Sequence, residues 1–181
     1  MSKALIVIDI QNDYFENGAI ELVKPIEASL NARKLVDFFR TKNLPVVHIQ
    51  HLSADANLPI FVPGTFGSEI HENVKPQDGE KVIQKYYPNS FKETDLLDYL
   101  KSKGITEVVV TGMMTHMCVD STTRAAKDLG FDCTVIGDAC ASRDLEINGK
   151  TVKAEDVHNA FLSALTFFYA KVQSTEEYLS A

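Results

Sequence analysis

The chain has 181 residues, with 18 Lys and Arg against 25 Asp and Glu, so its net charge is −7 when the histidines are neutral. This length is typical of one domain with a buried core, and we expect residues 1–181 to form a single domain. The acidic balance and the lack of a Lys/Arg cluster argue against nucleic acid or a membrane surface as a partner, and no apolar run approaches the roughly 20 residues that span a bilayer. The apolar run at residues 4–8 ends at Asp9, which predicts neither a membrane anchor nor a signal peptide.

The first half of the chain predicts two strands joined by a helix and followed by a long loop. Residues 4–10 are almost all apolar and rich in β-branched side chains, which indicates a strand covered on both faces. Residues 25–42 carry apolar side chains with a period of 3.6 residues, as in a helix with one buried face, and residues 44–50 predict the next strand. The stretch 51–91 is rich in Pro and Gly and predicts a long loop, interrupted by a short strand at 81–84.

Strands and helices continue to alternate in the second half. Thr94 is expected to cap a helix that ends at Gly104. Strands are then predicted at 106–111, 133–137 and 170–173, and helices at 119–129 and 154–169. Because alternating strands and helices form right-handed crossovers, we predict an α/β fold, a three-layer sandwich with a central six-stranded, mainly parallel sheet and helices on both faces. Ligands bind such sheets at the carboxyl ends of the strands.

Three common motifs of α/β enzymes are missing from the sequence. The chain has no Gly-x-Gly-x-x-Gly for dinucleotides, no Gly-Lys-Ser/Thr phosphate loop and no Gly-x-Ser-x-Gly serine nucleophile. We therefore expect no cofactor, and a nucleophile other than serine.

Three residues that could carry chemistry lie near the predicted carboxyl ends of strands. Asp9 ends an apolar strand, where a buried carboxylate is costly unless it is paired. Cys118 follows the strand at 106–111 by a short turn and opens a helix, where free N–H groups and the helix dipole favour a thiolate. Lys85 ends a short strand, and near Cys118 it would lower the pKa of the thiol. Each also has an ordinary interpretation, as a loop-capping aspartate, a space-filling cysteine and a solvated lysine.

The chain has three cysteines, Cys118, Cys133 and Cys140. An odd number without Cys-x-x-Cys spacing favours reduced thiols, so we expect a cytoplasmic protein. Cys133 lies within a predicted strand and fits a buried, space-filling thiol, whereas Cys140 in the following loop fits either interpretation.

Five segments spread over nearly the whole chain form a recognisable series. They are Asp9-Ile-Gln-Asn-Asp-Tyr-Phe15, Pro63-Gly-Thr-Phe-Gly-Ser-Glu-Ile-His71, Lys85 with Ser90-Phe91, Val110-Thr-Gly-Met-Met-Thr-His-Met-Cys118-Val, and Asp138-Ala-Cys-Ala. In this order they resemble the isochorismatase-like cysteine hydrolase family, which includes nicotinamidases and related small-amide hydrolases. The segment around Cys118 is the most specific of the five.

The resemblance implies a catalytic triad of Asp9, Lys85 and Cys118, and a cis peptide bond between Met113 and Met114. In this mechanism Asp9 takes the proton of Cys118, Lys85 holds the negative charge, and the thiolate attacks a carbonyl to give a thioester. Asp9 then returns the proton to the leaving amine and activates water. The backbone N–H groups of Met114 and Cys118 would form the oxyanion hole. The resemblance also implies a homodimer or homotetramer.

Two departures from the family pattern narrow the expected chemistry. Nicotinamidases carry a metal-binding Asp-x-His motif where this chain has His48, His51 and Asp55, so we expect no metal. We expect His48 and His51 to face different directions, as two uncoupled surface or pocket histidines. Isochorismatases cleave a vinyl ether and commonly lack the cysteine. The presence of Cys118 therefore favours hydrolysis of a non-peptide C–N bond in a small amide, lactam, carbamoyl or ureide.

Mostly apolar side chains near the motifs are candidates for the wall of a small-molecule pocket. They are Phe15, Phe91, Met113, His116 and Met117. Most of these side chains are expected to be ordinary packing residues. His116 also suggests a Cys/His pair, which we rank below Asp9 because the resemblance implies a position at the pocket rim.

Other functional classes give distinct expectations. The pocket could belong to a non-catalytic metabolite-binding module, in which the triad residues serve as structure, or to an isochorismatase-type vinyl ether hydrolase. A redox sensor ranks lower because no resolving cysteine is close to Cys118. Fast, selective alkylation of Cys118 would favour an activated nucleophile, whereas equally slow alkylation of all three cysteines would favour the binding module.

Overall fold

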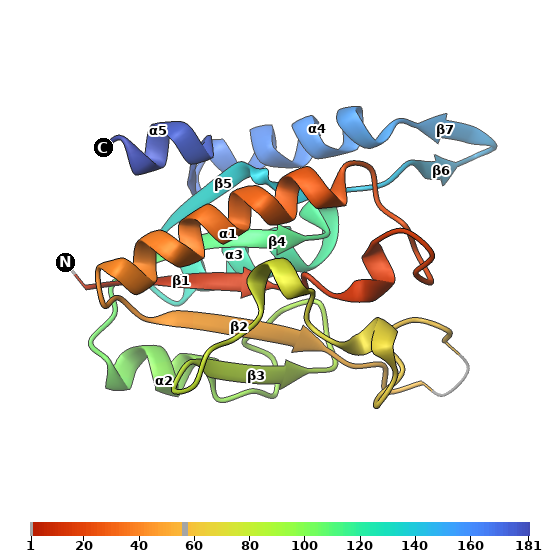
Figure 1. Cartoon of the computed structure of the whole chain (residues 1–181). Helices are drawn as coiled ribbons and strands as arrows, with labels where there is room; N and C mark the ends of the chain where they lie inside the picture. Colours follow the sequence, from red (N-terminus) through yellow and green to blue (C-terminus); the bar gives the residue numbers. More distant parts are fainter. Residues whose placement is uncertain (1, 56–57) are drawn as a thin grey trace.

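The computed structural model describes residues 2–55 and 58–181, in which a six-stranded sheet lies between helices (Figure 1). The strands of this sheet are β1 (Lys3–Ile8), β2 (Val46–His51), β3 (Lys81–Lys85), β4 (Glu107–Met113), β5 (Asp132–Ala141) and β8 (Lys171–Gln173). Their spatial order is β3-β2-β1-β4-β5-β8, and each neighbouring pair is parallel. The predicted α/β sandwich is confirmed, with a sheet that is wholly rather than mainly parallel.

Helices cover both faces of the sheet and enclose two apolar cores. The helices are α1 (Pro25–Thr41), α2 (Leu96–Ser102), α3 (Asp120–Asp128), α4 (Ala154–Thr166) and α5 (Thr175–Leu179). Successive side chains of a strand point to opposite faces, so Leu5 and Val7 of β1 pack with α1 and α5, whereas Ile6 and Ile8 pack with the helices α2, α3 and α4. Burial of each such side chain contributes about 1.5–3 kcal/mol to the free energy of unfolding.

No helix within 2–55 and 58–181 is long and apolar enough to cross a membrane.

A two-stranded hairpin and a short helix in the second half were not predicted. A hairpin of β6 (Leu145–Ile147) and β7 (Lys150–Val152) turns at Asn148 and Gly149, which both have positive φ. An Asn-Gly pair is the strongest short-range signal for such a turn, so the sequence did contain the evidence. The short helix α5 begins with a capping box between Ser174 and Glu177.

The starts of two helices differ from the prediction. The N-cap of α2 is Asp95 rather than Thr94, whose hydroxyl donates to the Ser90 carbonyl at 2.6 Å. Before α3, the chain forms a π-helical turn, Thr115–Val119, so Cys118 lies within that turn and not at the first residue of a regular α-helix.

The carboxyl edge of the sheet has a switch point between β1 and β4. From β1 the chain continues to β2 and β3 on one side, and β4, β5 and β8 lie on the other side. Gly112 of β4 pairs with Ile8 of β1 and has a φ of 135°, and a Cβ there would collide with the Ile8 carbonyl oxygen. This close approach brings the loops that follow β1 and β4 together, which is where open α/β sheets bind ligands.

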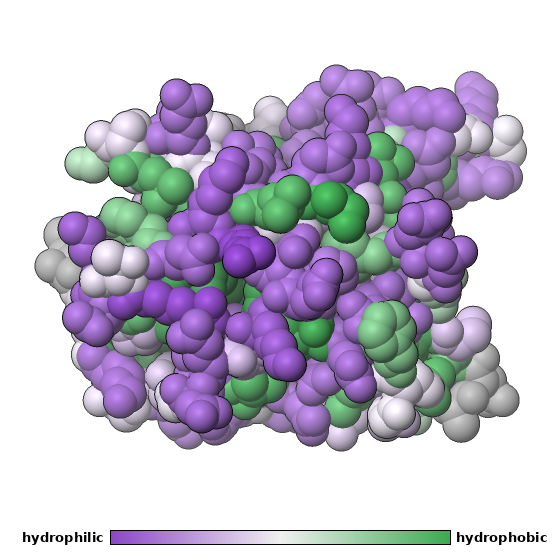
Figure 2. Space-filling view, in the orientation of Figure 1, coloured by the Kyte–Doolittle hydropathy of each residue, from purple (hydrophilic) through white to green (hydrophobic). Residues whose placement is uncertain are grey.

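The outer face of α1 carries exposed aliphatic side chains. The face drawn in Figure 2 is largely hydrophilic, with a hydrophobic band along α1, where Ile26 and Leu30 are 47% and 43% exposed. Scattered exposed aliphatic residues are common on monomers, so self-association stays a prediction.

A polar cluster around Glu80 ties α1 and β2 to the loop before β3. The Glu80 carboxylate accepts hydrogen bonds from Arg40 Nε at 2.7 Å and from the Gln77 N–H at 2.9 Å, and its Oε2 lies 2.8 Å from His48 Nε2. Burial by itself would raise the pKa of Glu80, but the bonds from Arg40, Gln77 and His48 outweigh it and lower the pKa from 4.5 to about 2.

We expect Glu80→Gln to lower the free energy of unfolding by about 2 kcal/mol at neutral pH. Because the pKa of Glu80 is lower in the folded chain, its contribution is complete above 4.5 and is lost as the pH falls toward about 2. Urea unfolding of both proteins over this pH range measures the effect. A difference between them that stays constant down to the acid end of the range would contradict this assignment.

Candidate active site

A buried ion pair joins the carboxyl ends of β1 and β3. Asp9 follows the last residue of β1 with a φ of 50°, and Lys85 is the last residue of β3. Lys85 Nζ lies 2.8 Å from Asp9 Oδ2 and donates to the Pro88 carbonyl at 2.9 Å. Both side chains of the ion pair are fully buried, so neither is the solvated or loop-capping residue of the ordinary interpretation.

The two charges stabilise each other. Burial would raise the pKa of Asp9, but the attraction of Lys85 and the bonds from His51 and Lys85 outweigh it, so the pKa lies below the usual value. Burial would lower the pKa of Lys85, but Asp9 and Cys118 raise it above the usual value. Both groups of the pair are therefore charged near neutral pH.

We expect Lys85→Met to lower the free energy of unfolding by about 3–5 kcal/mol, because it leaves the Asp9 carboxylate buried without its partner. The double variant Asp9→Asn/Lys85→Met should recover most of this loss. Lys81→Met is the matched control, since Lys81 lies on the same strand but pairs with Asp95 at the surface, where such pairs contribute about 0–1 kcal/mol. Equal losses in Lys85→Met and Lys81→Met would contradict the prediction.

The π-helical turn brings Cys118 to this ion pair. The turn follows β4 through a cis peptide bond between Met113 and Met114, as the family resemblance implied. Within the turn, the Thr115 hydroxyl donates to the Ala141 carbonyl at 3.1 Å. The Cys118 sulfur, an Asp9 carboxylate oxygen and an imidazole nitrogen of His51 all lie within 4.8 Å of one another. The structure thus brings together Asp9, Lys85 and Cys118, the three residues that the sequence singled out, although they are far apart along the chain.

The surroundings of the Cys118 thiol raise its pKa above the usual value, in the direction opposite to the thiolate-favouring effect expected at a helix start. Burial and the negative charge of Asp9 raise its pKa, and Lys85 offsets only part of this effect. Cys133 and Cys140 are buried thiols with a pKa of about 12, raised by burial. Formation of a Cys118 thiolate therefore needs a base that accepts the proton, and the Asp9 carboxylate is adjacent.

His51 belongs to the same cluster, and, as predicted, it faces in a different direction from His48. Its Nδ1 atom lies 3.6 Å from Asp9 Oδ2 and 3.8 Å from Cys118 Sγ. His48 of the same strand faces away and pairs with Glu80. The sequence did contain a signal: His51 ends the strand beside β1, and the carboxyl ends of parallel strands meet at one edge.

The grouping of a carboxylate, an imidazole and a thiol also resembles a set of metal ligands. The Lys85 ammonium, 2.8 Å from Asp9 Oδ2, already supplies a positive charge there and would repel a bound cation. We therefore assign no metal to this cluster, and the expectation that none is needed stays a prediction.

The predicted pocket residues occupy different environments. Phe15 is buried and stacks on His71 with ring centroids 3.7 Å apart, Met113 is fully buried in the core beneath α1, and Phe91 packs against Phe131. Met117 is 42% exposed, and the half-buried His116 has its Nδ1 atom 2.7 Å from Ser142 Oγ. His116 is thus engaged by Ser142, and the histidine within reach of the Cys118 sulfur is His51.

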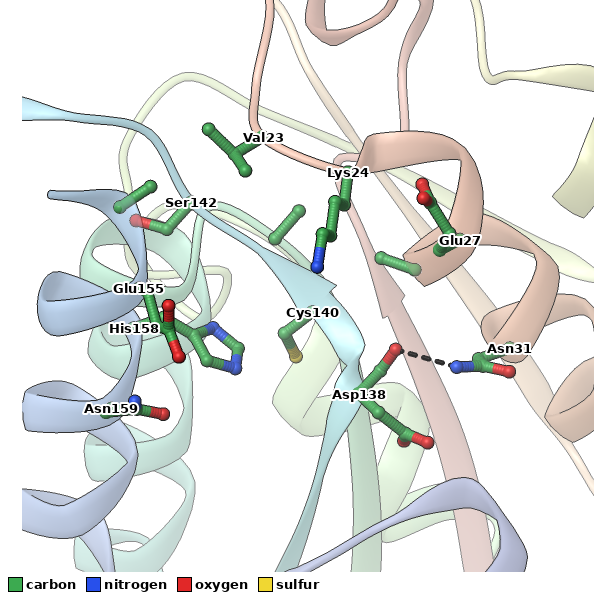
Figure 3. A pocket seen from close by; sticks show the side chains of 13 residues that line it. Val23, Lys24, Glu27, Asn31, Asp138, Cys140, Ser142, Glu155, His158 and Asn159 are labelled. Atoms are coloured by element: carbon green, nitrogen blue, oxygen red, sulfur yellow. Dashed lines mark hydrogen bonds between the residues drawn. The ribbon is translucent and has the colours of Figure 1, made fainter.

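A separate cavity of about 520 Å³ lies at the carboxyl end of β5, between α1 and α4 (Figure 3). Lys24 and Glu27 line one side and His158 the other, and the Asn31 side chain donates to the Asp138 carbonyl at 2.9 Å. Its lining includes neither Cys118 nor Asp9. The cavity is therefore distinct from the thiol cluster.

Comparison with known proteins gives a consistent family assignment. A family model described as the isochorismatase domain matches residues 3–177. The uncharacterised isochorismatase family protein YddQ of Bacillus subtilis (strain 168) is 50% identical over 179 residues, covering 99% of each chain. A solved structure from Oleispira antarctica, classed among the isochorismatase hydrolases, has a TM-score of 0.95 at 47% identity and covers 99% of this chain and 97% of its own. N-carbamoylsarcosine amidase from Thermoplasma acidophilum has a TM-score of 0.83 at 26% identity, with 97% of each chain covered. The chain therefore belongs to the isochorismatase family of hydrolases.

Proposed function

We propose that this protein is a cysteine hydrolase that cleaves the C–N bond of a small non-peptide amide, lactam, carbamoyl or ureide through a thioester on Cys118. The observation that carries the proposal is the cluster itself, in which the Cys118 sulfur lies within 4.8 Å of an Asp9 carboxylate oxygen that Lys85 keeps charged. Similarity to N-carbamoylsarcosine amidase supports a carbamoyl or related amide as the substrate class.

Acylation begins with proton transfer from the Cys118 thiol to the Asp9 carboxylate. The thiolate attacks the substrate carbonyl carbon, and the resulting oxyanion is stabilised by the backbone N–H groups of Met114 and Cys118, each contributing about 3 kcal/mol. The C–N bond then breaks as Asp9 returns the proton to the leaving nitrogen. The acyl group remains on sulfur as a thioester.

Lys85 has an electrostatic role in this scheme. Without its ammonium, the buried Asp9 carboxylate would take up a proton and could not act as a base. Lys85 also favours the thiolate, because its charge lowers the pKa of Cys118. Lys85 thus keeps Asp9 in the ionised form that can accept a proton, and it stabilises the thiolate that the transfer leaves on Cys118.

Ammonia release from a panel of small primary amides, carbamoyl compounds and ureides tests the proposal, with lactam opening followed by mass spectrometry. The purified full chain is expected to release ammonia from at least one member and to carry the matching acyl mass on Cys118 during turnover. Turnover without a covalent acyl-enzyme would contradict the thioester mechanism. Turnover of isochorismate by a Cys118→Ala variant would instead favour the vinyl ether hydrolase, and binding without turnover would favour the metabolite-binding module.

A further inference from the structure

Two walls of different chemistry face each other across the cavity of about 520 Å³ between α1 and α4 (Figure 3). A cavity of this volume is large enough for a small molecule. Its floor is the end of β5, with the buried residues Cys140 and Ser142. The proposed amide hydrolysis uses none of the residues that line it, so the cavity has no role in that scheme.

The wall on the α1 side carries a positive charge. Lys24, directly before α1, has a φ of 55°, which is uncommon for residues other than glycine, and its ammonium points into the cavity (Figure 3). Within residues 2–55 and 58–181, Lys24 forms no ion pair. The positive end of the α1 dipole lies beside it. The Glu27 carboxylate points away from this space (Figure 3). The α1 wall therefore suits a carboxylate.

The wall on the α4 side offers hydrogen-bond acceptors. His158 Nδ1 lies 2.9 Å from Thr115 Oγ1, and the Thr115 hydroxyl donates its own proton to the Ala141 carbonyl. Nδ1 therefore carries the ring proton, which leaves Nε2 as an acceptor that faces the cavity (Figure 3). Burial lowers the pKa of His158, so the ring is neutral near pH 7. Glu155, one helical turn earlier, adds a carboxylate to this wall.

Two other polar groups of the lining are already bonded within the protein. The N–H of Ala154, at the start of α4, donates to Asp144 Oδ1 at 2.8 Å. The Asp138 carboxylate accepts hydrogen bonds from the N–H and the hydroxyl of Thr175, both at 2.8 Å. Neither the start of α4 nor this carboxylate is therefore the group that would hold a ligand.

A cation on one wall and two acceptors on the other match a zwitterion. The carboxylate of a free amino acid would pair with the Lys24 ammonium, and its ammonium would donate to His158 Nε2 and to the Glu155 carboxylate. Lys24 is exposed, and its flexible four-carbon chain can adjust to the position of the ligand.

The α4 wall also contacts the turn that holds Cys118. Thr115, the partner of His158, is the first residue of the π-helical turn, and Ser142 Oγ in the floor lies 2.7 Å from Nδ1 of His116 in the same turn. An ammonium at Nε2 of His158 would polarise the ring and strengthen the hydrogen bond from Nδ1 to Thr115. The turn would then be held more tightly.

We propose that this cavity binds a free amino acid as an effector, and that the bound amino acid restrains the turn that carries Cys118. The inference goes beyond the proposed amide hydrolysis. Its two measurable consequences, binding and thiol reactivity, do not depend on that activity.

Isothermal titration calorimetry of the full chain, with each standard amino acid tested singly, measures binding. At least one amino acid is expected to bind. Its N-acetyl derivative, which lacks the ammonium, and the corresponding amine, which lacks the carboxylate, should bind about 10-fold or more weakly.

Variants of the two walls locate the binding site. In Lys24→Met and in His158→Phe the affinity for the amino acid should also fall by about 10-fold or more. Lys42→Met is the matched control, because it removes the same charge at the other end of α1 and should leave the affinity unchanged. All variants are first checked for cooperative thermal unfolding.

Timed alkylation with iodoacetamide measures the effect on the turn. A buried thiol reacts through local opening of the structure, so the saturating amino acid should slow alkylation of Cys118 by about 2-fold or more and leave Cys133 unchanged. Thr115→Val removes the link to His158. This variant should still bind the amino acid but show no protection of Cys118.

Four results would overturn the inference. Either no amino acid binds, or the affinity is unchanged in both Lys24→Met and His158→Phe. Equal binding of the N-acetyl derivative would exclude recognition of a zwitterion. Binding without slower alkylation of Cys118 would exclude the effector role. A dimer that excludes amino acids, and that Lys24→Met weakens, would assign the cavity to an interface between two copies of the chain.

Discussion

Cys118→Ala is expected to abolish C–N bond hydrolysis, with a loss of at least about 10⁴-fold in turnover of any amide that the wild type cleaves. The reason is that the thioester route has no substitute nucleophile. Among residues 2–55 and 58–181, Cys133 and Cys140 lie outside the cluster of Asp9, His51 and Cys118. Coupled detection of ammonia, with substrate in excess, measures the loss.

Cys133→Ala is the matched control for this prediction. Cys133 is also buried, but its sulfur contacts backbone carbonyls of Thr123 and Phe131 rather than a carboxylate. This control variant should keep its turnover and lose only packing stability. A Cys118→Ala protein that still hydrolysed the amide would rule out covalent catalysis at this position.

Asp9→Asn is expected to have opposite effects on hydrolysis and on thiol reactivity. Turnover should fall by about 10²–10⁴-fold, because the amide cannot accept the thiol proton. The Cys118 thiol should nevertheless become more acidic and react faster with iodoacetamide, because the negative charge of Asp9 raises its pKa and Lys85 lowers it. A residue with only a structural role would not separate the two measurements in this way.

Peptide mapping after timed alkylation at mildly alkaline pH gives the thiol reactivity, with Cys133 and Cys140 as internal controls in the same protein. If Asp9→Asn slowed alkylation of Cys118 along with hydrolysis, the electrostatic account of the cluster would be wrong. In the wild type all three thiols are buried with raised pKa values, so slow alkylation there does not argue for a binding module.

The sequence by itself predicted the architecture of the sheet and three residues of the candidate site. Apolar, β-branched runs predicted the six parallel strands, because a strand covered on both faces must be apolar along its length. Asp9, Lys85 and Cys118 were candidates because each stands at the predicted carboxyl end of a strand or just beyond one, and the family resemblance selected them over their ordinary interpretations. These inferences depend on local pattern, on a general rule of parallel sheets and on the resemblance of short motifs to a known family, all of which can be read without coordinates.

Only the tertiary structure decided how the pKa of Cys118 is shifted and which residues lie in the cluster around it. The position of Cys118 after β4 predicted a thiolate, but the pKa of a buried thiol depends on desolvation and on the sign of neighbouring charges, and these come from Asp9 and Lys85 on other strands. His51 joins the cluster because strand register and the Gln11 side chain set its position. The distances between strand ends are set by the packing of the whole sheet, so they cannot be read from any short segment of the sequence.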